Sequence, residues 1–168
     1  MFEWLCHEMK TCIIEAEGNF NHPGTQIQQL AFAELEGSTA GPLVGRFNEA
    51  LTYLCASSRE ELEILNSITK RLKDLKDKRN DLIHGAWAVG FGDGDFSKAI
   101  SRKFKRDKNG AHFKSLEFQA QELDDLEAEA RELADMIMII GGCLGFFDPF
   151  AKYFRKEDAT GRWRKKTQ

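Results

Sequence analysis

The stretch that decides the fold is residues 59–86, REELEILNSITKRLKDLKDKRNDLIHGA. Its leucines and isoleucines recur at steps of three and four, which places them on one face of a helix about seven turns long. Ser58 and Glu61 have the spacing of a capping box, in which a serine hydroxyl and a glutamate bond to each other's backbone amides at a helix start. Gly85 is typical of a helix end. Within the apolar stripe, Arg79 is the polar interruption.

Other segments repeat this helical periodicity. Residues 2–17 and about 42–56 each gather apolar side chains on one face, and residues 120–147 carry them at the steps typical of a bundle seam. A shorter helix is expected from about Thr25 to about residue 36. The fold predicted from these patterns is mainly α-helical, all-α in class, with the helices in an antiparallel bundle.

Residues 86–119 follow a different pattern. Ile100 and Phe104 alternate with basic residues, and Leu116 and Phe118 alternate with charged ones. Between the two runs, Asn109-Gly110 is a typical hairpin turn. We therefore expect a small β-hairpin excursion after the long helix.

Length and composition limit the remaining choices. A chain of 168 residues supports one substantial core, so we expect a single domain over 1–154 and a mobile basic tail over 155–168. The longest apolar run, 136–147, has 12 residues, whereas a membrane span needs about 20. The first residues do not resemble a secretion signal. These features favour a cytoplasmic protein that makes no contact with membrane.

No cofactor and no metal site are expected from the sequence. The four cysteines lack the paired spacing of zinc ligands, which favours free and mostly buried thiols. Acidic residues of the last long helix are interpreted as its solvated face rather than as a metal site; they are Glu127, Glu129, Glu132 and Asp135.

Charge is distributed unevenly. The chain as a whole has a net charge of −3, which argues against indiscriminate binding to polyanions. Residues 70–108, however, hold 12 basic and 6 acidic side chains, whereas residues 1–69 hold 3 basic and 10 acidic ones. The long helix and the segment after it are thus the basic part of the chain.

The polar residues near the end of the long helix suggest a chemistry. Residues four apart stack on one helical face, so Lys76, Asn80 and His84 line up, with Trp87 close by if the helix continues that far. Arginine binds phosphate through a forked guanidinium, and histidine transfers protons near neutral pH. Such a set is able to cleave RNA without a metal, because the RNA supplies its own 2′-hydroxyl as nucleophile. That reaction uses a base and an acid, whereas one chain has a single well-placed histidine. A symmetric dimer would supply the second one.

The string RNDLIHG, residues 79–85, resembles the motif of the HEPN superfamily, in which an arginine and a polar residue precede a histidine near the end of a long helix. The resemblance extends over about 40–147. It implies a HEPN-type helical bundle that dimerises across the motif helix and, in many members, a metal-independent endoribonuclease acting as a toxin or in phage defence. Arg79 and His84 would then be catalytic and Asn80 would orient them. The implied products carry 2′,3′-cyclic phosphate ends.

Several alternatives stay open at this level. The residues expected to bind RNA are Lys76, Lys103, Lys105, Arg106 and Trp87. The basic residues after the helix also suit the solvated face of a hairpin, and the tryptophan suits a core. The implied partners are a second copy, RNA and an antitoxin or other defence-system protein. A non-catalytic HEPN-like module that binds a protein or a nucleotide is the alternative function. A plain helical scaffold is the third, with His84 bonded to the last carbonyls of its helix.

Overall fold

The structure is a computed structural model that describes residues 1–17, 33–84, 86–89, 98–108 and 110–166. The chain divides into two compact units, one of Met1–Lys73 with Ala130–Gln168 and one of Asp74–Glu129. The expected single domain over 1–154 stays a prediction, since compact units can belong to one domain. The two longest helices each contribute residues to both units, which a helical period in the sequence does not reveal.

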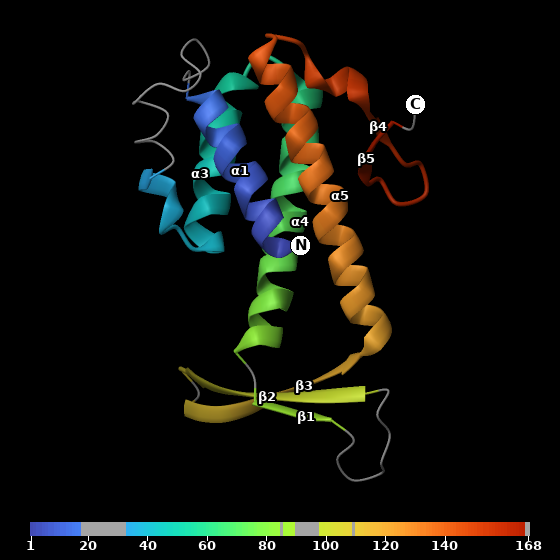
Figure 1. The fold of residues 1–168 in the computed structure, drawn as a ribbon. Helices are drawn as coiled ribbons and strands as arrows, with labels where there is room; N and C mark the ends of the chain where they lie inside the picture. Colours follow the sequence, from blue (N-terminus) through green and yellow to red (C-terminus); the bar gives the residue numbers. More distant parts are fainter. Residues whose placement is uncertain (18–32, 85, 90–97, 109, 167–168) are drawn as a thin grey trace. The chain divides into compact units, whose positions relative to one another are not determined.

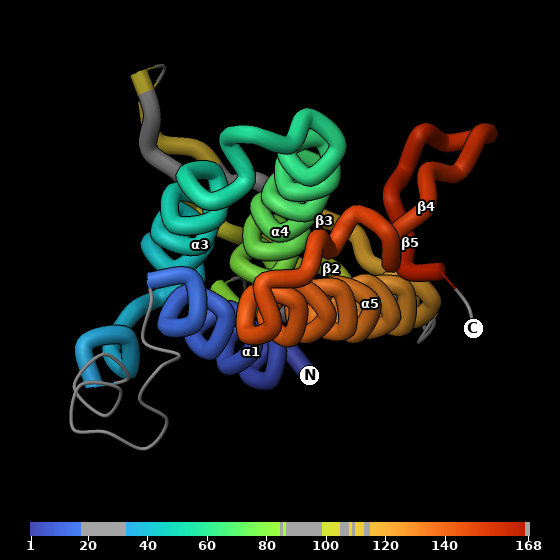
Figure 2. The backbone as a smooth tube through the Cα atoms, turned by 90° about the horizontal axis from the view of Figure 1, so that it is seen from above, coloured from blue at the N-terminus to red at the C-terminus, as the bar shows by residue number. Residues whose placement is uncertain are grey.

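The first unit is built from helices around a common core (Figures 1 and 2). Its helical elements are α1 (Phe2–Ala16), α3 (Ala40–Leu54), the first part of α4 (Arg59–Ile83) and the second part of α5 (Ala120–Gly145). α1 packs against α3. The core comes from the apolar faces seen in the sequence and includes Leu5, Met9, Ile13, Phe47, Leu51, Leu65, Ile68, Leu72, Leu133, Ile137 and Ile140. The mainly helical class is confirmed, and these four helices lie within about two residues of their predicted bounds. The first part of the short helix predicted near Thr25 lies outside the described residues, and residues 33–36 are helical.

The start of α4 confirms one half of the predicted capping box. The Ser58 hydroxyl accepts a hydrogen bond from the Glu61 amide at 3.3 Å. The Glu61 carboxylate does not complete the reciprocal bond of the box; its Oε1 instead accepts the Phe150 amide at 2.9 Å, 89 residues along the chain. Glu61 thus makes a tertiary contact in place of the local bond expected from the capping box.

We expect Ser58→Ala to lower the free energy of unfolding by about 1 kcal/mol, because an orphan amide of the first turn loses its acceptor. Ser57→Ala is the matched control, since the exposed Ser57 precedes the cap. Urea unfolding of both variants measures the difference. An equal loss in the two would contradict the capping role of Ser58.

The end of α5 has an unusual residue in a common motif. The Asp148 amide bonds to the Cys143 carbonyl at 2.9 Å and the Phe147 amide to the Leu144 carbonyl at 3.2 Å, which is the Schellman pattern. Glycine usually occupies the left-handed position of this motif, but here Phe147 does, with φ 53°. A side chain in this region costs roughly 1–2 kcal/mol.

Phe147→Gly is therefore expected to raise the free energy of unfolding by about 1 kcal/mol, because the strain is removed and the exposed ring contributes little burial. Thermal unfolding followed by circular dichroism measures it. The neighbouring Phe146→Gly, where φ is not positive, serves as control and should bring no gain. A lower melting temperature for Phe147→Gly would contradict the assignment of strain.

The C-terminal segment forms a hairpin rather than the expected mobile tail. After a 3-10 helix η2 (Phe150–Tyr153), strands β4 (Phe154–Lys156) and β5 (Trp163–Lys165) pair antiparallel. Phe154 and Trp163 are buried, and the Lys156 ammonium lies over the Trp163 ring, 5.8 Å from its centroid. The two aromatic side chains explain why a segment rich in basic residues holds to the helices.

The second unit contains the end of α4, a sheet and the start of α5. Its strands are β1 (Ala86–Val89), β2 (Lys98–Asp107) and β3 (Gly110–Gln119), antiparallel in the order β1-β2-β3. The predicted hairpin is confirmed as β2 and β3, with Asp107 paired to Gly110 across the turn. Gly110 has φ 108°, a conformation that favours glycine. Strand β1 extends the hairpin to three strands; its sequence AWAV lacks the polar alternation by which strands are recognised.

The cysteines are free thiols, as predicted, with three of them buried. Burial raises the pKa of Cys12, of Cys143 and of Cys55, the last to about 11. These thiols are therefore protonated at neutral pH. Within the described residues, no helix is both long and apolar enough to cross a membrane.

Glu15 of α1 makes the stability of the first unit depend on pH. Burial, and then the negative charge of Glu8, raises the pKa of the Glu15 carboxyl above its ordinary 4.5. The carboxyl lies against Gly141 of α5, where a Cβ would stand 2.6 Å from its Oε2. Since the folded pKa is the higher one, the associated stability is fully present below pH 4.5 and is lost as the pH rises through the folded pKa.

Glu15→Gln is expected to be more stable than the wild type at pH 7 and to lose this advantage below pH 4.5, because the variant carries no charge at this half-buried position. Urea unfolding at a series of pH values measures the difference. Glu3→Gln, at an exposed position of the same helix, is the control. An advantage for Glu15→Gln that is independent of pH would contradict the assignment.

Candidate functional site

The motif residues lie at the end of α4, within the second unit. Arg79 and Asn80 are half-buried, and His84 is exposed. α4 ends at Ile83, and the His84 amide still bonds to the Asn80 carbonyl at 3.2 Å. The histidine is therefore held by the last turn of the helix, with its ring accessible to solvent.

Asp81, between Asn80 and His84, ties this helix end to the sheet of the same unit. The hydroxyl of Ser101 on β2 donates to the Asp81 carbonyl at 3.4 Å, and Ser101 is only 1 % exposed. The ammonium of Lys103, two residues further along β2, lies 3.6 Å from Asp81 Oδ1. Residues two apart on a strand share a face, so β2 contacts Asp81 at both its carbonyl and its carboxylate. Asp81 therefore connects the end of α4 to β2, and the sequence reasoning missed it.

The basic residues expected to bind RNA are partly engaged within the chain. Lys103 pairs with Asp81, and the Lys76 ammonium lies 3.0 Å from Asp77 Oδ1. Lys105 and Arg106 belong to β2, opposite His112 and Ala111 of β3. The side chains of Lys105 and Arg106 lie outside the described part of the structure.

Trp87 was placed close to His84 only on the condition that the helix continues that far. The helix ends at Ile83, and Trp87 belongs to strand β1, where it pairs with Ser101 of β2. Its side chain lies outside the described residues. The predicted alignment on one helical face therefore holds for Lys76, Asn80 and His84 alone.

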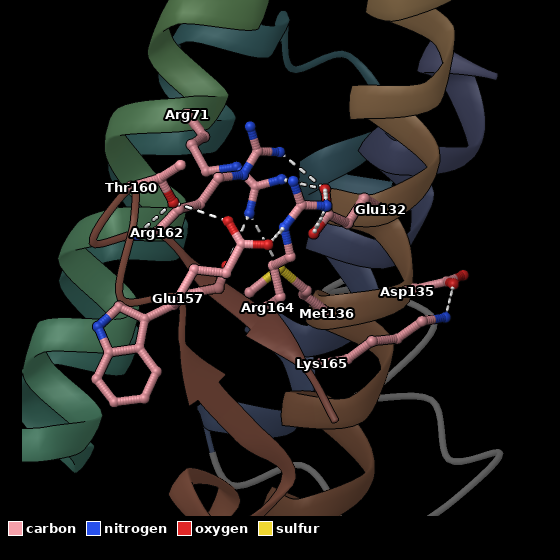
Figure 3. Close-up of polar contacts among 10 residues, drawn as sticks. Arg71, Glu132, Asp135, Met136, Glu157, Thr160, Arg162, Arg164 and Lys165 are labelled. Carbon is pink, nitrogen blue, oxygen red and sulfur yellow. Dashed lines mark hydrogen bonds and ion pairs between the residues drawn. The ribbon is translucent and has the colours of Figure 1, made fainter. Parts of the chain in front are cut away.

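A second polar constellation, here called the arginine cluster, lies in the first unit and consists of Arg71, Arg162 and Arg164 around Glu132 (Figure 3). Arg71 and Arg162 each donate to Glu132 Oε2 at 2.8 Å, and Arg164 lies 3.4 Å from both carboxylate oxygens. This corrects the interpretation of Glu132 as part of a solvated face. The sequence separations of 61, 30 and 32 residues explain why no local pattern signalled the contact.

Further pairs hold the C-terminal hairpin against the helices. Arg164 pairs with Glu157 at 2.7 Å, and Lys165 pairs with Asp135 of α5 (Figure 3). A hydrogen bond from Thr160, aided by the positive charges of Arg164 and Arg162, lowers the pKa of Glu157. Because each of these groups is matched by opposite charge, we interpret the arginine cluster as a structural clamp between α4, α5 and β5.

The candidate catalytic residues are thus Arg79 and His84, with Asn80 and Asp81 beside them. Among the described residues, no three histidine, cysteine, aspartate or glutamate side chains are grouped closely enough to hold a metal ion. Compared with known proteins, the chain matches no family model, no curated protein and no solved structure.

Proposed function

We propose that this protein is a metal-independent endoribonuclease of HEPN type that acts as a homodimer. Its composite site would contain Arg79 and His84 of both chains, oriented by Asn80. The observation that carries the proposal is an exposed histidine at the end of a long helix, five residues after a half-buried arginine and next to an anchoring aspartate.

The reaction is a transesterification within the RNA. One His84 takes the proton of a ribose 2′-hydroxyl, and the 2′-oxygen attacks the adjacent phosphorus. The bond from phosphorus to the 5′-oxygen breaks, and the partner subunit's His84 donates a proton to that oxygen. Arg79 stabilises the negative charge that builds on the phosphoryl oxygens. The products are a 2′,3′-cyclic phosphate and a 5′-hydroxyl.

Helix geometry supports the need for two chains. At about 100° and 1.5 Å per residue, positions five apart lie roughly 140° around the axis and 7.5 Å along it. Arg79 and His84 of one chain therefore point to different sides of α4. A two-fold axis beside the helix end would bring the arginine of one chain toward the histidine of the other.

The surroundings of the motif supply the remaining parts of the proposal. The contacts from β2 to Asp81 fix the turn that carries Asn80 and His84, which limits the conformational freedom of the proton-transfer group. Lys76 and Lys103, with Lys105 and Arg106 further along β2, would guide the RNA backbone, and Trp87 would stack a base.

The cellular role belongs to the same proposal. From the resemblance to the HEPN superfamily, we propose a toxin or phage-defence ribonuclease of the cytoplasm that an antitoxin or another defence-system protein controls. The non-catalytic module that binds a protein or nucleotide is the other outcome that the following test separates.

The test incubates the full chain with a mixed RNA pool in EDTA and analyses the ends formed. We expect cuts that leave 2′,3′-cyclic phosphate and 5′-hydroxyl ends, because the 2′-hydroxyl is the nucleophile. Cuts that leave 3′-hydroxyl and 5′-phosphate ends would contradict the mechanism. Absence of cutting, with nucleotide or RNA binding that Arg79→Ala abolishes, would establish the binding module instead.

A further inference from the structure

An exposed apolar face runs along the second half of α5, in the first unit. Met138 is 52 % exposed and Phe146 85 % exposed, and Gly142 lies between them at the same helical spacing of four. A Cβ built on Gly142 would meet nothing within 4 Å, so the space above the helix is open there. Apolar side chains at steps of four form a continuous stripe on one side of a helix.

Gly142 and Phe146 of this face line a recess, here called the α5 groove, with a volume of about 730 Å³. Its apolar lining consists of Ile139, Gly142 and Cys143 of α5 and of Phe146, which directly follows the helix. Residues after α5 complete the lining, namely Asp148, Lys152, Tyr153, Lys165 and Lys166. The volume falls in the range of sites that take ligands or side chains of a partner.

The rim of the α5 groove carries an excess of positive charge. Lys152 pairs with Asp148 at 2.6 Å and Lys165 with Asp135. The Lys166 ammonium instead donates to the Lys152 carbonyl at 2.6 Å, a contact that leaves its charge in place. Three ammonium groups thus stand at one recess against two carboxylates, and the complementary surface is both apolar and acidic.

The neighbouring Phe147 adds an independent observation. It is 87 % exposed and keeps a left-handed backbone that glycine would adopt without strain. Two adjacent phenylalanines in solvent at the end of a helix are the kind of side chains that anchor protein interfaces. Local stability does not account for them.

We infer that the α5 groove is the docking site of an acidic amphipathic helix from a partner protein. The apolar stripe of that helix packs on Ile139, Gly142 and Phe146, and its carboxylates face Lys152, Lys165 and Lys166. A lipid surface fits less well, because the groove is concave and the adjoining recess at Phe147 is lined by Glu61 and Asp148. The inference is independent of the proposed function.

The test measures binding of two labelled helical peptides to the full chain by fluorescence anisotropy. Both have leucine at positions i, i+3, i+4 and i+7; one has glutamate at the remaining positions and the other lysine. We expect the acidic peptide to bind at least 10-fold more tightly than the basic one, and Phe146→Ser and Lys166→Glu each to weaken it about 10-fold. Tyr53→Ser is the matched control, since Tyr53 is also 85 % exposed but lies outside the groove.

Three results would overturn the inference. The first is equal affinity for both peptides, or binding of neither. The second is a sedimentation mass that is lower for the Phe146→Ser variant than for the wild type, which would make a second copy of the chain the occupant. The third is sedimentation of the wild type, but not of Phe146→Ser, with phosphatidylserine vesicles, which would make the occupant a lipid surface. Circular dichroism melting of each variant verifies that the fold is intact.

Discussion

His84→Ala is expected to lower the rate of RNA cleavage by about 10²–10⁴-fold, because the proton transfers to and from the ribose and leaving oxygens lose their catalyst. Arg79→Ala is expected to lower it by about 10²–10³-fold through lost stabilisation of the phosphoryl charge. Single-turnover cleavage of a labelled RNA in EDTA measures both effects. The exposure of His84 predicts that its loss leaves the melting temperature unchanged.

Matched controls separate catalysis from a general change in charge. His112→Ala removes an exposed histidine from β3 of the same unit, and Arg131→Ala removes an exposed arginine from α5. Both variants should cleave at the wild-type rate. Rates for His84→Ala and Arg79→Ala that equal those of the controls would refute the assignment of the motif.

Glu132→Ala is expected to lower the free energy of unfolding by about 3 kcal/mol, because three guanidinium groups would be left close together without their shared carboxylate. The side chains of Glu132 and Arg71 are 18 % and 10 % exposed, so water screens their pair only weakly. Arg162 and Arg164 are more exposed, which keeps the effect at the lower end of the range for buried pairs. Urea unfolding followed by circular dichroism measures the loss.

Asp135→Ala is the control for that experiment, because it removes one carboxylate of α5 that also pairs with the C-terminal hairpin, at Lys165. The Lys165 side chain is 46 % exposed, and the expected loss is below about 1 kcal/mol. A Glu132→Ala variant no less stable than Asp135→Ala would show that the arginine cluster does not act as a clamp.

The helices were predictable because their cause is local. Periodic apolar positions and the spacing of Ser58 and Glu61 are visible in a short window of sequence, and the structure has α4 from Arg59. The β2–β3 hairpin was visible for the same reason, since alternation and the turn at Asn109-Gly110 are local signals.

The missed features depend on residues far apart in the chain. The Glu61 carboxylate accepts a hydrogen bond from the Phe150 amide, and the Glu132 carboxylate accepts one from Arg71. Only tertiary packing brings these residues together. The C-terminal hairpin resembles a mobile tail in sequence because its basic residues outnumber Phe154 and Trp163, the two side chains that it buries. Charge composition indicates solvation only where no opposite charge is brought near by the fold.

The position of the candidate site was predictable from the sequence, but the contacts that hold it to the sheet were not. Its sequence signal placed Arg79, Asn80 and His84 near a helix end, which is where the structure has them. The contacts of Asp81 with Ser101 and Lys103 had only a weak sequence signal. That signal is a small polar residue and a lysine two positions apart on a predicted strand. The strand that carries Trp87, β1, was not predictable because its sequence AWAV lacks the polar alternation that indicates a strand.

The central claim is that His84 of both chains serves one site, and mixed dimers test it most directly. Wild-type and His84→Ala chains are unfolded together in equal amounts, refolded and assayed for cleavage of the labelled RNA. If each site requires both histidines, random pairing leaves about one quarter of the wild-type activity, because only that share of dimers carries His84 twice. A remaining activity of about one half would mean that each chain cleaves by itself, and would contradict the composite site.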